Sequence, residues 1–158
     1  MLLLGDPRVA SRWGGLFRRP PPPEVENGED AVRGYTSTVL ELLTRWEDLH
    51  QHWLGAVDEQ RRNERLANAA AVYRWQLNAI GAQLEALAVP PAVAGWHEAL
   101  VEALAVASSG TRLLSHGYRF HNVRMICDGG LVLEEARERE RVVRDALRDA
   151  AGQQVGAG

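Results

Sequence analysis

Residues 66–87 read LANAAAVYRWQLNAIGAQLEAL, and apolar side chains recur in this stretch every three or four positions. That spacing matches the 3.6-residue turn of an α-helix, so the apolar side chains form one continuous stripe. The stripe consists of Leu66, Ala70, Tyr73, Leu77, Ile80, Leu84 and Leu87. Pro90 and Pro91 follow and cannot continue the helix. The sequence therefore predicts a helix over residues 64–88 that buries one face.

Similar stripes lie on both sides of this helix. Residues 30–62 carry one made of Val32, Tyr35, Val39, Leu42, Trp46, Leu49, Trp53 and Ala56. Residues 91–127 carry another, from His97 through Leu100, Leu104 and Leu114 to His121 and Met125. Asp128, Gly129 and Gly130 predict a turn, because glycine adopts the backbone angles that end a helix. A fourth helix is then predicted over residues 131–151.

The short connections between these segments favour one architecture. Sequential helices joined by short turns lie antiparallel and adjacent, so we expect an all-α, up-down-up-down antiparallel four-helix bundle over residues 30–151 with coiled-coil-like seams. Residues 1–29 are expected to be a flexible, disordered Pro-rich tail because of the run Pro20 to Pro23, and residues 152–158 a second tail. One continuous helix over residues 30–88 is an open alternative, because no Gly or Pro separates its two halves.

The composition limits the classes of function. The chain has 158 residues and a net charge of −3, so we expect one domain and no nucleic-acid partner. All 18 basic residues are arginine, which we attribute to codon bias. A single cysteine excludes an internal disulfide, and no apolar run is long enough to span a bilayer. We expect a cytoplasmic protein, or an exported one if the natural start lies upstream.

Residues 84–104 carry a further pattern, in which Leu84 and Leu87 precede the pair Pro90 and Pro91, and His97, Leu100 and Leu104 follow. This pattern resembles that of uncharacterised bacterial helical-bundle proteins, in which a Leu-rich helix ends before a Pro-Pro step and the next helix bears an early histidine. The resemblance implies a helical bundle and no known chemistry. Many such proteins look exported, whereas this sequence shows no leader.

Five histidines raise the question of a metal site. Glu47 and His50 have the Glu-x-x-His spacing of di-iron bundles, but such sites need a second copy of this motif, which the sequence lacks. In an antiparallel bundle His50, His121 and Glu135 could approach the same end, together with His116 and Cys127, and form a weak zinc or iron site. The alternative is that His50 and His121 are hydrogen-bonded residues between helices.

Arginines and a histidine also align on one predicted helix face. Arg112, His116 and Arg119 follow i, i+4, i+7 spacing, so they are weak candidates for binding a phosphate or a carboxylate. The alternative is that these arginines pair with acidic neighbours such as Glu134 and Glu135.

The remaining signals concern protein contacts. Trp75 and Trp96 stand beside the apolar stripes, and such aromatics often mark a partner or homodimer surface. Neither Cys127 with His121 nor Ser115 with His116 forms a supported nucleophile and base pair. We therefore expect a non-catalytic bundle without a cofactor that acts through protein–protein contacts, as a homo-oligomer or with another protein. The alternative is a metal- or small-anion-binding bundle with a site near His50, His116 and His121.

Overall fold

The computed structural model describes residues 26–59 and 61–156. Within these ranges the chain forms four long helices and one short 3-10 turn, and no strand. The elements are α1 (Glu26–Glu59), α2 (Asn63–Glu85), η1 (Pro91–Val93), α3 (Ala94–Arg119) and α4 (Val123–Gly156). This confirms the prediction of an all-α protein with four helices.

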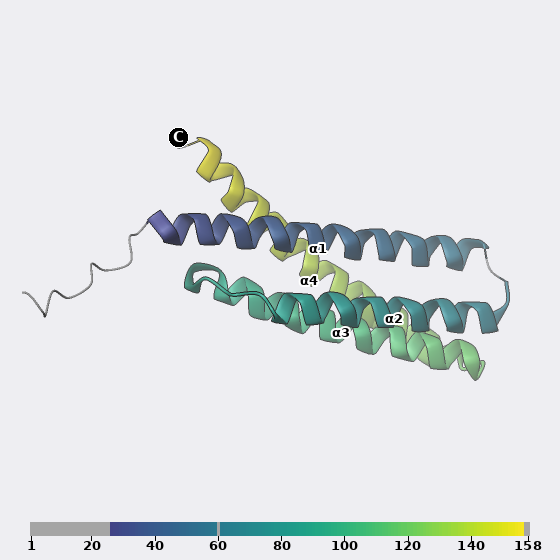
Figure 1. The fold of residues 1–158 in the computed structure, drawn as a ribbon. Helices are drawn as coiled ribbons and strands as arrows, with labels where there is room; N and C mark the ends of the chain where they lie inside the picture. The colour runs from purple at the N-terminus through teal and green to yellow at the C-terminus, as the bar shows by residue number, and fades with distance from the viewer. Residues whose placement is uncertain (1–25, 60, 157–158) are drawn as a thin grey trace, which may run out of the picture.

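The helices pack in chain order and connect at alternating ends of the molecule (Figure 1). α2 lies against α1 and α3, and α3 lies against α4. α4 crosses α1 obliquely, and its C-terminal turns extend past α1 in Figure 1. These contacts are consistent with a helical bundle in which α1 contacts both α2 and α4.

The apolar stripes form the core, as their spacing predicts. Six of the seven stripe residues of α2 are buried, and Leu87 is partly buried against them. Trp46 of α1 and Leu104 of α3 are also buried in this cluster. Burying one such aliphatic side chain contributes roughly 1.5–3 kcal/mol, so the stripes supply the main force that brings the helices together.

α1 and α2 are separate helices, so the continuous-helix alternative is wrong. α1 ends at Glu59, and Arg62 has extended backbone angles immediately before α2 begins. The predicted 64–88 helix itself ends at Glu85, a few residues before Pro90, because the residue before a proline is disfavoured in a helix.

The turn between the last two helices lies earlier than the sequence predicts. α3 ends at Arg119, and His121 adopts a left-handed φ of 52°. The amide of Asn122 donates to the carbonyl of Gly117 at 2.8 Å, which closes the end of α3. The Asn122 side-chain oxygen accepts a hydrogen bond from the Met125 amide at 3.1 Å and so caps the start of α4. The predicted turn at 128–130 is therefore wrong, and so are the predicted limits of the helices on either side of it, 91–127 and 131–151.

The glycines of this region serve close helix packing. A Cβ on Gly129 would come within 2.9 Å of the Gly110 carbonyl oxygen, and a Cβ on Gly110 would come within 2.9 Å of the Leu133 amide nitrogen. A Cβ on Gly117 would come within 2.8 Å of Ile126. These positions let the backbones of α3 and α4 approach each other, so Gly129 lies inside a helix and does not end one.

The helix ends also differ from the predicted limits. α1 begins at Glu26, so residues 26–29 of the predicted tail are helical, and the rest of that tail lies outside the described residues. α4 continues to Gly156, beyond the predicted end at 151, because no proline stops it after Gly152. In the part of the chain that the structure describes, no helix is both long enough and apolar enough to cross a membrane.

Candidate functional site

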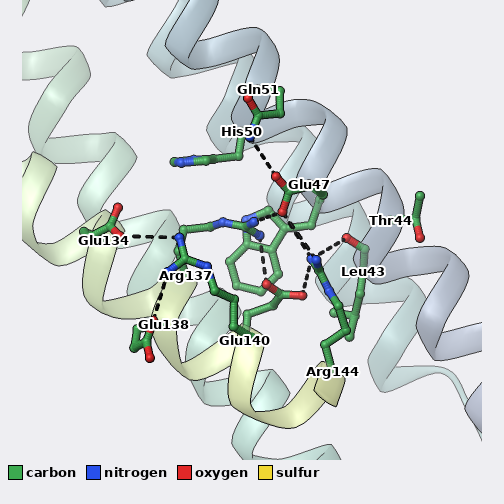
Figure 2. A network of polar contacts seen from close by, with 12 residues as sticks. Leu43, Thr44, Glu47, His50, Gln51, Glu134, Arg137, Glu138, Glu140 and Arg144 are labelled. Atoms are coloured by element: carbon green, nitrogen blue, oxygen red, sulfur yellow. Dashed lines mark hydrogen bonds and ion pairs between the residues drawn. The ribbon is translucent and has the colours of Figure 1, made fainter. Parts of the chain in front are cut away.

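The most unusual feature of the interior is a cluster of charged side chains between α1 and α4 (Figure 2). Arg137 is 1% exposed and Glu140 is 0% exposed, although both sit in the middle of a helical core. The Arg137 guanidinium donates to Glu140 at 3.0 Å and to Glu47 of α1. The two helices are thus joined through charged groups.

Arg144 completes this cluster from the next turn of α4. Its Nη2 atom lies 2.5 Å from Glu140 Oε1 and 3.4 Å from Glu47 Oε2. It also donates to the backbone carbonyl of Leu43 at 3.3 Å. Two guanidinium groups therefore face two carboxylates, and the formal charges of the cluster balance. Buried charges persist when they are paired in this way.

The environment shifts the pKa values of the two carboxyl groups in opposite directions. A hydrogen bond from Gln51, assisted by Arg137, lowers the pKa of Glu47 to about 2. Burial raises the pKa of Glu140, while Arg137 and Arg144 act against that rise. Glu47 is consequently the more firmly ionised of the two carboxylates.

Aromatic and hydroxyl groups extend the cluster towards α2. The Arg137 guanidinium lies over the Trp46 ring, 5.5 Å from its centroid. The Trp46 indole donates to the Tyr73 hydroxyl at 3.2 Å, and the same hydroxyl pairs with His50 Nδ1 at 3.2 Å. Burial raises the pKa of Tyr73 and lowers that of His50, so both groups stay neutral at pH 7. Three helices therefore meet through one polar chain.

This arrangement positions helices and offers no evident chemistry. Each of its charged groups is ion-paired with another member of the cluster, and Arg137 and Glu140 are buried, so the cluster does not present a free acid or base to a ligand. What it can do is fix the register of α1 against α4, because any slide would separate buried charges. None of Arg137, Glu140 and Arg144 is among the candidate residues predicted from the sequence. The signal that could have found them is their i, i+3 and i, i+7 spacing, which places them on the side of the helix that carries Leu133 and Val143.

The weak metal candidates occupy three different settings. His50 is buried against Tyr73, and His121 is an exposed residue whose Nδ1 accepts a hydrogen bond from Asn63 at 2.7 Å. Glu135 is exposed and accepts from Arg139 at 2.7 Å. Among residues 26–59 and 61–156, no three His, Cys, Asp or Glu side chains gather as metal ligands would. His50 therefore matches the alternative prediction of a hydrogen-bonded residue between helices, and its partner is Tyr73.

The anion candidates are all exposed, and the expected charge pairing is not observed for two of them. Arg112, His116 and Arg119 lie on the outside of α3. Glu134 and Glu135 pair with Arg141 and Arg139. Neither Arg112 nor Arg119 has an ion pair within the described part of the chain.

The outward face of α2 is a second candidate region, and it is uncharged. Between Leu66 and Gln83 the only charged residue is Arg74. The exposed residues on the side away from the core are Asn68, Ala71, Val72, Trp75 and Ala82. Trp75 is 72% exposed and Val72 is 55% exposed. We call these five residues the outer α2 face.

A face of this kind can bury apolar area against another protein, and it presents no group suited to catalysis. The resemblance of residues 84–104 to bacterial helical-bundle proteins stays a prediction. No protein-family model, curated protein or solved structure matches this chain.

Proposed function

We propose that this chain is a non-catalytic, up-down-up-down antiparallel helical bundle that acts through protein–protein contacts, and that the outer α2 face is its contact surface. The observation that carries the proposal is the exposure of Trp75 in the middle of a helix face without charge. Tryptophan is the residue type most enriched among the residues that dominate binding energy at interfaces, and charged residues are depleted at interface centres.

Two exposed apolar residues of α4 have surroundings that differ from those of the outer α2 face. α4 carries the exposed apolar residues Leu131 and Val142, but charged residues surround them on that helix. On the outer α2 face, by contrast, alanines flank the large side chains, so another helix could approach the backbone closely. Binding there would desolvate few polar groups and would therefore cost little.

The partner we propose is a second copy of this chain. Trp75 lies near the middle of α2 (Asn63–Glu85), so a two-fold axis beside it would place the two α2 helices antiparallel. Positions equally far from Trp75 would then face each other. Asn68 would meet Ala82 of the second copy, and Val72 would lie opposite the helical turn that carries Asn78 and Ala79. Trp75 of one copy would lie beside Trp75 of the other, and the antiparallel arrangement of the two helix dipoles would be favourable.

Light scattering over a concentration series tests this proposal. We expect wild-type protein to approach the mass of two chains as its concentration rises, and the variant Trp75→Glu to keep the mass of one chain. Leu131→Glu is the matched control, because Leu131 of α4 is also 72% exposed. A wild-type mass of one chain at all concentrations would remove the homodimer, and equal dissociation by both variants would remove the role of α2.

Disulfide trapping tests the antiparallel arrangement separately. In a Cys127→Ser background, a chain that carries both Asn68→Cys and Ala82→Cys should form a covalent dimer on mild oxidation. A chain that carries Asn68→Cys alone should form far less, because its two cysteines would lie at opposite ends of the interface. Equal trapping of both chains would contradict the antiparallel pairing.

A further inference from the structure

A cleft opens at the end of the bundle where α1 connects to α2 and α3 turns into α4. Its volume is about 760 Å³, which lies within the range of small-molecule sites. The connection before α2 contributes Arg61 and Arg62, the end of α3 contributes Tyr118 and Arg119, and the following turn contributes His121. Segments distant in the sequence therefore converge on one hollow.

The cleft is cationic in a chain whose net charge is negative. Three arginines line it, whereas its only acidic lining residue is Glu64. In the described ranges, none of Arg61, Arg62 and Arg119 takes part in an ion pair or a side-chain hydrogen bond, and none of the three is among the residues with further contacts. The arginines of the α4 surface, Arg139 and Arg141, are each paired with two carboxylates. The guanidinium groups of the cleft are thus free to take an external anion.

A hydrogen bond across the cleft ties its two sides together. Asn63, the first residue of α2, donates to His121 Nδ1 at 2.7 Å. The left-handed backbone of His121 places its ring at this position, directly after the end of α3. Since Nδ1 accepts this hydrogen bond, the proton of the neutral ring resides on Nε2, which stays a donor. The walls of the cleft are therefore linked before any ligand binds.

We infer that this cleft binds a small, multiply charged anion of the phosphate class. Arginine presents a planar fork of N–H donors that matches phosphate oxygens, and three such forks suit a diphosphate better than a single carboxylate. The start of α2 adds the positive end of a helix dipole and has no side-chain cap. This site is separate from the outer α2 face. It shares Arg119 with the predicted anion-binding stripe, but Arg61 and Arg62 line it and Arg112 and His116 do not.

Isothermal titration of the full-length chain with inorganic pyrophosphate tests the inference. We expect saturable binding that weakens as salt is added, because the attraction is ionic. The double variant Arg61→Gln/Arg119→Gln should weaken the affinity by about tenfold or more, since two charge-assisted contacts are lost. The same titration with ADP shows whether the ligand is the diphosphate alone or a larger organic phosphate: equal affinity indicates the former and tighter binding the latter.

The matched control is Arg112→Gln/Arg148→Gln, which removes the same charge from two exposed arginines outside the cleft. This control should bind pyrophosphate within about twofold of wild type, because only the general field of the protein changes. Absence of binding by both pyrophosphate and ADP, or an equal loss in the control variant, would overturn the inference. All four substituted arginines are exposed, so circular dichroism should show that both variants fold.

Discussion

Gly129 and Gly130 are neighbours in the sequence, and we expect their substitution by alanine to change stability in opposite directions. Both lie inside α4, but their surroundings differ. A Cβ at Gly130 would have no atom within 4 Å, whereas a Cβ at Gly129 would lie 2.9 Å from the Gly110 carbonyl oxygen and 2.9 Å from the Leu114 amide nitrogen. The Leu114 Cγ atom would also lie 2.9 Å away, and because the other two close atoms belong to the backbone, α3 and α4 would have to move apart.

The magnitudes follow from two opposing effects. Replacing glycine by alanine in an open helix position stabilises the helix by roughly 0.5–1 kcal/mol, and Gly130→Ala should show this gain. Inserting a methyl group into a packed contact costs about 1–3 kcal/mol. Gly129→Ala should therefore lose up to about 2 kcal/mol after the helix gain is included.

Urea unfolding followed by circular dichroism measures both variants against wild type. The comparison also separates the observed fold from the turn that the sequence alone predicts at 128–130. In such a turn the glycine would have a left-handed backbone, and Gly130→Ala would then destabilise the protein. A loss of stability in Gly130→Ala, or equal effects of the two substitutions, would refute the continuous α4 helix and its glycine contact with α3.

Three further predictions concern the charged cluster and its aromatic extension. Glu140→Gln should destabilise the fold by about 3–5 kcal/mol in urea unfolding, because it leaves the buried Arg137 without its carboxylate partner on α4. The control Glu138→Gln, on the exposed side of α4, should change stability by less than about 0.5 kcal/mol. The folded pKa of Glu47, about 2, lies below its ordinary value of 4.5, so its contribution is present above pH 4.5 and is lost as the pH falls towards 2. Because Glu47 is partly exposed, we expect only about 1–2 kcal/mol from this effect, and Glu47→Gln should show a correspondingly smaller loss of stability in acid unfolding than wild type. Tyr73→Phe should cost about 1–3 kcal/mol in thermal or urea unfolding, since the buried Trp46 indole loses its acceptor, and an unchanged stability would show that this hydrogen bond has a substitute.

The location of the candidate surfaces was only partly predictable. Trp75 stands off the apolar stripe in the sequence, and this sufficed to predict an exposed aromatic. The sequence also indicates Arg119 and His121 as binding candidates. It groups Arg119 with Arg112 and His116, and His121 with His50 and Glu135, whereas the structure places both residues in the cleft with Arg61 and Arg62. Arg61 and Arg62 line the same cleft as these two residues. Their position there depends on where α1 ends and where α3 ends, and neither helix end is marked by glycine or proline.

The misplaced turn has a definite physical reason. Gly129 and Gly130 were interpreted by their conformational freedom, which ends helices in isolation. In the folded chain the same lack of a side chain at Gly129 allows α3 and α4 to touch at Gly110, and that packing outweighs the weak helix propensity of glycine. The real turn depends on Asn122 as a cap and on His121 in a left-handed conformation, and histidine gives little indication of such a turn.

By itself the sequence determined that the chain is helical and which side of α1 and α2 faces inward, because the period of apolar residues is a local property that each helix carries alone. Only the tertiary structure decided where α3 ends, that Arg137 and Glu140 lie inside the core, and which arginines share a cleft. Those outcomes depend on contacts between segments far apart in the chain, and the spacing of residues within one helix does not encode them.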